Sequence, residues 1–361
     1  MSVKVPGKLF IAGEYAILFP KQPAIIIAVD QFLTATIQQS ELINSGTITT
    51  ELAELSPLTY SRTNGQLVTD ETANSQWKYV LNAIEVAEEL IKTLDISIKN
   101  FKIHYQSQLV NKDGLKFGLG SSGAVVVATI KALLNFYGLE SINNNTLFKL
   151  AAIALIKSRS NGSLADIATI THGGWVYYQS FDRQWLKVQI EAQQPIDSLL
   201  LDKWPDLIIE SLTPPDDLSL LIGWTQAPAS TDNLVDQLLD QLDGNQEPLD
   251  AFLVQSAASV ERMRDGFRKQ NLETIKTEIN VYRQLLILLG HIYSLNIETN
   301  TLNQLIQSAQ PYHYAAKSSG AGGGDCGIAI GSKNNSISNL INDWKKVGIE
   351  TLPLNVTTTF K

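Results

Sequence analysis

The sequence predicts a two-domain protein that contains both helices and strands. Its 361 residues are enough for two domains with sizeable cores. Segments rich in β-branched residues occur in both halves, and apolar residues at helical spacing lie between them. The Pro-rich, acidic stretch "LTPPDD" at 212–217 is typical of a connection between domains. We place an N-terminal domain at residues 1–190 and a C-terminal domain at residues 191–361.

The N-terminal half begins with two β-branched segments, "VKVPGKLFIA" and "AIIIAVDQFLTATIQ", which predict strands. A single apolar stripe over residues 76–94 predicts a helix, whereas "NFKIHYQSQL" alternates between polar and apolar residues as a strand does. The expected strands are residues 3–12, 24–38, 100–109 and 174–190. The expected helices are residues 76–94, 122–137 and 145–158.

The C-terminal half has a more helical pattern. Its apolar residues recur at helical spacing through most of residues 248–290, and the segment "CGIAIG" has the composition of a strand. The expected helices are residues 248–290, 299–309 and 335–347. The expected strands are residues 207–212, 218–225, 326–331 and 349–358.

The composition is that of an ordinary globular protein, with 44% hydrophobic and 18% charged residues. The net charge is −8 and no run of Lys or Arg occurs, so we expect no nucleic-acid partner. The apolar runs are too short to span a bilayer and no signal pattern is visible, so we expect no membrane partner. The single cysteine, Cys326, fits a reducing compartment and predicts a cytoplasmic location. Nothing in the sequence requires an oligomer.

Residues 117–124, "FGLGSSGA", place three glycines and two serines directly before an apolar helical run. Glycine permits positive φ angles and close approach of a ligand, and a helix N-terminus offers unpaired N–H groups to an anion. The loop matches G-x-G-x-x-G, but no strand with an acidic end follows the helix, as a dinucleotide site requires. We interpret it as a serine-rich phosphate loop. A tight turn with one serine as the helix cap is the alternative.

Two further segments indicate close approach of a ligand or another part of the chain. "KSSGAGGGDCG" at 317–327 contains five glycines, more than one turn needs, although a flexible loop is an alternative. Lys8 lies in the otherwise apolar "KLFIAG", where burial of its charge is costly unless it meets an anion. A lysine that faces solvent from an edge strand is the alternative there.

Three segments resemble, in order, the three motifs of the superfamily of galactokinase, homoserine kinase, mevalonate kinase and phosphomevalonate kinase, the GHMP kinases. They are "VPGKLFIAGEYAIL" (5–18), "KFGLGSSGAV" (116–125) and "KSSGAGGGDCGIA" (317–329), so the resemblance covers nearly the whole chain. Tyr15, the run "GGGDCG" and the segments "SNGSLADIAT" and "YYQSFDR" look most like the bacterial phosphomevalonate kinases.

Two positions depart from the family pattern. Many relatives have Ala after the paired serines, where this chain has Gly123. The common Gly-Ser-Gly-x-Asp reads "GSLAD" at residues 162–166. Both departures bear on the identity of the acceptor.

The resemblance implies an α+β fold of two domains with the active site in the cleft between them. It implies ATP-dependent phosphorylation of (R)-5-phosphomevalonate to (R)-5-diphosphomevalonate, in the mevalonate pathway of isoprenoid biosynthesis, with Mg²⁺ as cofactor. ATP and phosphomevalonate are the expected partners. A mevalonate kinase and a non-catalytic binding protein on the same fold are the alternatives, and the presence of Lys8, Ser122 and Asp166 argues against the second.

The resemblance also implies roles for individual residues. Asp166 is expected to orient Lys8 if the acceptor is a phosphate, and to act as a base if it is a hydroxyl. The expected catalytic residues are Lys8, Lys116 and Asp166. The expected nucleotide-binding residues are Gly118, Leu119, Gly120, Ser121, Ser122 and Gly123, of which Ser122 also binds Mg²⁺. The expected substrate-binding residues are Glu14, Tyr15, Arg159, Ser163, Arg183, Lys317, Ser319, Gly320 and Ala321.

Overall fold

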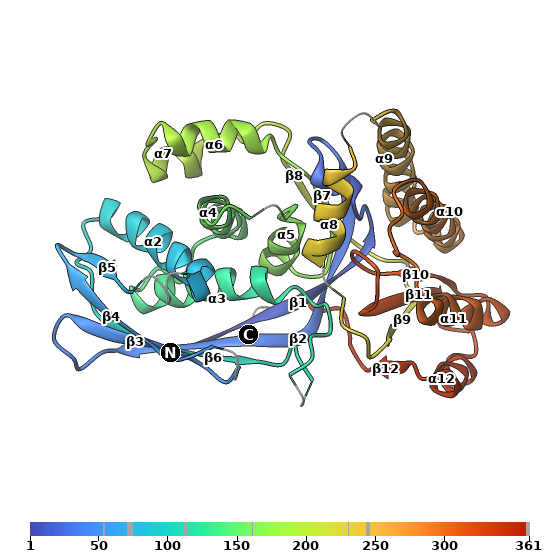
Figure 1. Cartoon of the computed structure of the whole chain (residues 1–361), viewed down its shortest axis with the longest axis horizontal. Helices are drawn as coiled ribbons and strands as arrows, with labels where there is room; N and C mark the ends of the chain where they lie inside the picture. Colours follow the sequence, from blue (N-terminus) through green and yellow to red (C-terminus); the bar gives the residue numbers. More distant parts are fainter. Residues whose placement is uncertain are drawn as a thin grey trace.

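The computed structural model describes residues 1–52, 55–70, 75–111, 114–160, 162–229, 231–242 and 246–358. In this part of the chain two β-sheets lie next to each other, and helices pack against both (Figure 1). The N-terminal half forms the larger sheet, blue to green in Figure 1, and the C-terminal half forms the smaller one.

The larger sheet contains eight strands within the described residues, in the order β5–β4–β3–β6–β2–β7–β8, with β1 paired to β2. The 17 residues of β2 are long enough to pair antiparallel with β1, β6 and β7, whereas β3 and β6 are parallel. The strands are β1 (Ser2–Ala12), β2 (Pro23–Gln39), β3 (Ser45–Thr50), β4 (Leu58–Thr63), β5 (Gln66–Val68), β6 (Phe101–Ser107), β7 (Trp175–Gln179) and β8 (Ile208–Leu212).

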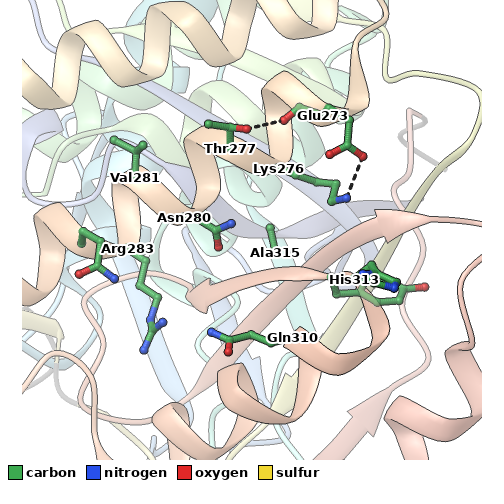
Figure 2. Close-up of a pocket in the computed structure, with 11 residues that line it drawn as sticks. Glu273, Lys276, Thr277, Asn280, Val281, Arg283, Gln310, His313 and Ala315 are labelled. Atoms are coloured by element: carbon green, nitrogen blue, oxygen red, sulfur yellow. Dashed lines mark hydrogen bonds and ion pairs between the residues drawn. The ribbon is translucent and has the colours of Figure 1, made fainter.

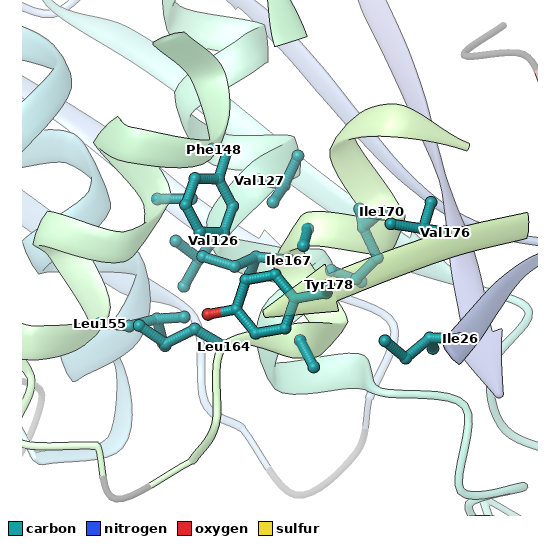
Figure 3. Packing of buried hydrophobic residues seen from close by; sticks show 14 of the residues in the cluster. Ile26, Val126, Val127, Phe148, Leu155, Leu164, Ile167, Ile170, Val176 and Tyr178 are labelled. Carbon is teal, nitrogen blue, oxygen red and sulfur yellow. The ribbon is translucent and has the colours of Figure 1, made fainter. Parts of the chain in front are cut away.

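One face of this sheet is covered by helices of the N-terminal half (Figure 1). Helix α3 packs on β1 and β2 and is itself covered by α2 and α4, so nearly all of its faces are apolar and buried. Figure 3 shows Val126 and Val127 of α3 beside Phe148 of α4 and Tyr178 of β7 in this core. The helices are α2 (Lys78–Thr93), α3 (Ser121–Phe136), α4 (Asn144–Lys157), α5 (Ala165–His172), α6 (Arg183–Glu191) and α7 (Ile196–Leu201).

The smaller sheet has the order β10–β11–β9–β12 and is antiparallel throughout. Helix α10 packs on β10 and β11, and α9 packs on α10 and reaches β2 of the larger sheet. The strands are β9 (Leu218–Trp224), β10 (Ala315–Ser318), β11 (Cys326–Ser332) and β12 (Glu350–Leu352). The helices are α8 (Thr231–Asp240), α9 (Glu247–Arg268), α10 (Leu272–Ile292), α11 (Asn300–Ala309) and α12 (Ile337–Lys346).

Three expectations about the elements need correction. The strand expected at 174–190 ends at Gln179, because Asp182 caps a helix by accepting a hydrogen bond from the N–H of Trp185 at 3.0 Å. The helix expected at 248–290 is two helices, since Asn271 caps the second one in the same way. The strand expected at 349–358 is confined to β12.

The chain after β12 returns to the larger sheet. The N–H of Thr357 donates to the carbonyl of Ala28 at 3.0 Å, and the N–H of Gly174 donates to the carbonyl of Thr357 at 2.7 Å. Asn355 likewise accepts the N–H of Asp30 and donates its own N–H to the Asp30 carboxylate. Residues 355–357 therefore complete hydrogen bonding along one part of β2.

The chain passes from the larger sheet to the smaller one between β8 and β9, at residues 213–217, because β8 still pairs with β7. This passage coincides with "LTPPDD" and lies about 20 residues after the domain boundary that we expected between residues 190 and 191. That boundary stays a prediction. Among the described residues, no helix combines the length and the apolar character that a bilayer span needs.

Candidate active site

The phosphate loop joins the segment after β6 to the start of α3. Gly118 and Gly120 both have a φ of 79°, which favours glycine, and Gly120 is the N-cap of α3. No side chain caps this helix, and the hydroxyls of Ser121 and Ser122 make no hydrogen bond within the described part of the chain. The first N–H groups of α3 and both hydroxyls therefore remain available to an anionic ligand.

Lys8 lies on β1 directly against this loop. Its backbone N–H donates to the carbonyl of Leu119 at 2.9 Å, and its Nζ donates to the carbonyl of Gly118 at 3.1 Å. The register of β1 against β2 shifts between Pro6 and Gly7, directly before Lys8. A Cβ on Gly120 would lie 2.8 Å from Cε of Lys8, so a larger residue there would displace the lysine side chain.

Asp166 lies in the first turn of α5, beside the same loop. The N-cap of α5 is Leu164, which has a φ of 65°, a left-handed conformation that is rare for a branched residue. A Cβ on Gly123 would lie 2.8 Å from Cγ of Asp166. The missing methyl group at Gly123, one departure from the family pattern, therefore makes room for the carboxylate of Asp166. Leu164, the other departure, caps the helix that carries Asp166.

Lys8 and Asp166 are electrostatic partners in a poorly solvated place. Burial lowers the pKa of Lys8 below its usual value, and the carboxylate of Asp166 is the strongest of the charges that oppose this shift. Burial raises the pKa of Asp166, and Lys8 opposes that shift in turn. A negatively charged ligand beside Lys8 would strengthen its charged form.

The third motif joins β10 to β11 and packs against the first motif. Lys317 is fully buried and forms an ion pair with Glu14, which is itself only 2% exposed. The hydroxyl of Tyr15 donates to the carbonyl of Ala321 at 2.5 Å, and that of Ser319 donates to the carbonyl of Phe10 at 2.8 Å. Five residues that we expected to bind substrate thus contact the other motif, and their substrate role stays a prediction. They are Glu14, Tyr15, Lys317, Ser319 and Ala321.

One buried polar atom at the contact between the first and third motifs has no hydrogen-bond partner among the described residues. The Oε1 atom of Glu14 binds Lys317 and lies 3.4 Å from the N–H of Gly320, whereas its Oε2 atom is buried and accepts no hydrogen bond among the described residues. A buried carboxylate oxygen without a donor is costly. The hydroxyl of a bound substrate is one group that would satisfy it.

The remaining predicted residues surround the loop before α5. Arg183 donates from Nη2 to the carbonyl of Ser160 at 2.8 Å, and Tyr178 donates its hydroxyl to the carbonyl of Ser163 at 3.2 Å. Arg159 is exposed and has a φ of 55°. Arg183 and Ser163 therefore belong to the surroundings of Asp166, and the structure gives Arg159 no contact with the motifs in its described part.

Sequence reasoning missed Asp325, which ends the glycine run of the third motif. Its carboxylate faces Lys8 and Lys116, and a Cβ on Gly118 would lie 2.6 Å from its Oδ2 atom. Lys116 is exposed and precedes the phosphate loop, as expected. The only sequence signal for Asp325 was an acidic residue inside a glycine-rich loop.

A cavity of about 560 Å³ lies elsewhere, between α10 and the residues that lead into β10 (Figure 2). Lys276 in its wall pairs with Glu273 at 2.8 Å, and Arg283 pairs with Glu298 at 2.7 Å. None of the residues that the sequence singled out is among the described residues of this wall.

Comparison with known proteins decides the family. Residues 78–174 match the GHMP kinases N terminal domain, and residues 263–350 match the GHMP kinases C terminal domain. The chain is 34% identical over 358 residues to the phosphomevalonate kinase of Streptomyces sp. (strain CL190), a match that covers 97% of this chain and 95% of that protein. The chain belongs to the GHMP kinases.

Solved structures agree with this family. The structure of Streptococcus pneumoniae phosphomevalonate kinase in complex with phosphomevalonate and AMPPNP matches this GHMP kinase with a TM-score of 0.85 and 33% identity, over 99% of both chains. The mevalonate kinase of Thermococcus onnurineus (strain NA1) is 26% identical, over 92% of this chain and 89% of that protein. The expected α+β GHMP kinase fold with N- and C-terminal domains is confirmed, as is the resemblance to phosphomevalonate kinases.

Proposed function

We propose that this GHMP kinase transfers the γ-phosphoryl group of ATP to the phosphate of (R)-5-phosphomevalonate, giving (R)-5-diphosphomevalonate and ADP. The observation that carries the proposal is the position of Lys8, whose ammonium lies between the phosphate loop and Asp166. Full-length similarity to phosphomevalonate kinases supports this choice of acceptor over mevalonate. A cytoplasmic location is part of the proposal.

The phosphate loop provides the nucleotide site. We infer that the unpaired N–H groups at the start of α3, together with the hydroxyls of Ser121 and Ser122, bind the phosphates of ATP. The available hydroxyl of Ser122 fits a Mg²⁺ ligand, because Mg²⁺ prefers oxygen donors and usually shares them with substrate phosphates. When bound, Mg²⁺ would neutralise phosphate charge. Lys116, just before the loop, would add a second positive charge from this chain.

Lys8 and Asp166 act on the transferring group. Phosphoryl transfer depends mainly on positioning and charge neutralisation, and Lys8 is the half-buried cation that meets the phosphate loop. The phosphate of the acceptor is largely ionised near neutral pH, since its second pKa is about 6, so it attacks without a base. Asp166 then serves to keep Lys8 charged and oriented. With a hydroxyl acceptor, the same carboxylate would instead take the proton.

The acceptor site would draw on both halves of the chain. Arg183 and Ser163, next to Asp166, offer a cation and a hydroxyl to the phosphate of the acceptor. The unpaired Oε2 atom of Glu14 would accept a hydrogen bond from the acceptor's hydroxyl group. Lys317 would hold Glu14 in place through their ion pair.

A coupled assay of ADP release tests the proposal. Wild-type protein is given saturating Mg·ATP and either phosphomevalonate or mevalonate, and the product is identified by mass spectrometry. We expect turnover with phosphomevalonate and little with mevalonate. A preference for mevalonate would refute the proposal and make Asp166 a general base. The Lys8→Met variant is the background control for contaminating kinases.

A further inference from the structure

Asp325 is held rigidly in a backbone conformation that few residues adopt. Its φ is 52°, in the left-handed region, and its position is fixed by hydrogen bonds to the segment that follows β9. Its N–H donates to the carbonyl of Ala227 at 2.8 Å, and its carbonyl accepts from the N–H and the hydroxyl of Thr225, both at 2.9 Å. The direction of its side chain is therefore determined by the fold of the C-terminal half.

The carboxylate of Asp325 points from the third motif to the phosphate loop. Its Oδ1 atom accepts the N–H of Ala229 at 3.1 Å, and its Oδ2 atom lies against the backbone of Gly118. Gly118 is the residue whose carbonyl binds Nζ of Lys8. Burial raises the pKa of Asp325, while the Ala229 N–H, Lys8 and Lys116 oppose this shift.

Several titratable groups surround Lys8. Asp166 faces it from α5, Asp325 and Cys326 face it from the third motif, and Glu14 faces it from the end of the first motif. Of these groups Glu14 is already paired with Lys317, and burial raises the pKa of the Cys326 thiol, which keeps it neutral. Asp166 and Asp325 are thus the two carboxylates that balance the charge of Lys8.

We propose that Asp325 is a positioning residue that keeps the Lys8 ammonium charged and aligned with the phosphate loop. The assignment of that ammonium to phosphoryl transfer rests on the proposed function. Lys8 and the phosphate loop both belong to the N-terminal half, whereas Asp325 belongs to the C-terminal half. The carboxylate of Asp325 is therefore what the C-terminal half adds to this site. The ionised form of Lys8 then depends on the third motif being packed in place.

The Asp325→Asn variant tests this inference with little other change. Asparagine tolerates a positive φ and its Oδ1 atom can still accept the N–H of Ala229, so mainly the negative charge is lost. The pKa of Lys8 is measured in the ligand-free full-length protein, from the pH dependence of its acetylation by acetic anhydride, quantified by mass spectrometry. Because the neutral amine reacts, we expect acetylation of Lys8 at pH 8 to be roughly three to ten times faster than in wild type.

A kinetic measurement complements the labelling. The alkaline limb of kcat with phosphomevalonate should move to lower pH in Asp325→Asn, with little change in the KM for ATP. Asp265→Asn is the matched control, since Asp265 is an exposed carboxylate on α9 that pairs with Lys269 at 3.8 Å. Neither Lys8 acetylation nor the pH profile should change in that variant.

The outcomes separate the two proposals. Unchanged Lys8 reactivity in folded Asp325→Asn protein would refute the role of Asp325, whatever the substrate. Faster acetylation in a protein whose wild type does not phosphorylate phosphomevalonate would instead support Asp325 and reject the proposed function. If Asp325→Asn does not fold, Asp325→Gly keeps the positive φ and removes the carboxylate, and the same labelling result is required.

Discussion

Replacing Gly123 by alanine is expected to damage catalysis far more than folding. Gly123 is the third residue of α3, and the added Cβ would lie 2.8 Å from Cγ of Asp166 and 3.2 Å from Cγ2 of Ile167. Ordinary van der Waals contacts begin at 3.4 Å, and Oδ2 of Asp166 would lie closer to the added Cβ than Cγ does, so the carboxylate must retreat by about 1 Å. The retreat moves it away from the loop on which Lys8 is positioned.

The expected magnitudes follow from this displacement. A misplacement of about 1 Å in a catalytic group can lower the rate roughly 100-fold. For folding, alanine in a helix gains about 0.5–1 kcal/mol over glycine, whereas crowding in a packed site costs about 1–3 kcal/mol. The gain offsets part of this cost and leaves a net loss of roughly 0–2.5 kcal/mol, so we expect Tm to fall by only a few degrees.

The assay compares kcat at saturating ATP and phosphomevalonate with Tm from thermal unfolding. Gly266→Ala is the matched control. Gly266 lies in α9 and is also crowded, because an added Cβ would lie 3.0 Å from Cγ1 of Ile275 in α10. We expect a similar change in Tm and an unchanged kcat for that control. A Gly123→Ala protein that keeps kcat within threefold of wild type would show that the position of Asp166 is not critical.

Three more substitutions test the site. Ser122→Ala should raise the KM for Mg·ATP with Tm unchanged, and kinetics that stay the same across Mg²⁺ concentrations would contradict the ligand role of this hydroxyl. Lys8→Met should fold normally but lose about 100- to 1,000-fold in kcat, and near-normal turnover would show that the charge of Lys8 does not assist the transfer. Lys317→Met should lower the free energy of unfolding by about 3–5 kcal/mol in urea titrations, because it leaves the Glu14 carboxylate buried and unpaired. Adding Glu14→Gln should recover part of that loss, and a Lys317→Met protein as stable as wild type would refute the buried pair.

The sequence alone predicted a phosphate loop at the start of α3, because glycines and serines before an apolar helix have a local physical meaning. It also singled out Lys8, since a lysine among apolar residues is conspicuous. The sequence could not show which residues of the three motifs contact one another. Glu14 and Lys317 are separated by 303 residues, and the sequence shows two charged residues without showing that they pair. They were therefore assigned to substrate, whereas the structure places them against each other.

Other differences have similarly local causes. The composition of residues 174–190 favoured a strand throughout, but the cap at Asp182 starts a helix in which only Leu186 is fully buried. Asp325 was visible within a motif, but the glycines around it indicated only a close approach to a ligand or another segment, with a flexible loop as the alternative. Only the hydrogen bonds from Thr225 and Ala229 show that this loop is held in one conformation.

The return of residues 355–357 to β2 has a consequence for biosynthesis. During translation the N-terminal strands emerge first, but the backbone partners of Ala28, Asp30 and Gly174 are made more than 100 residues after the last strand of their sheet. The nascent N-terminal half therefore leaves the ribosome with β1 paired to this stretch of β2 but without the hydrogen bonds from residues 355–357. The N-terminal half thus reaches its final backbone pairing only after residues 355–357 have been made.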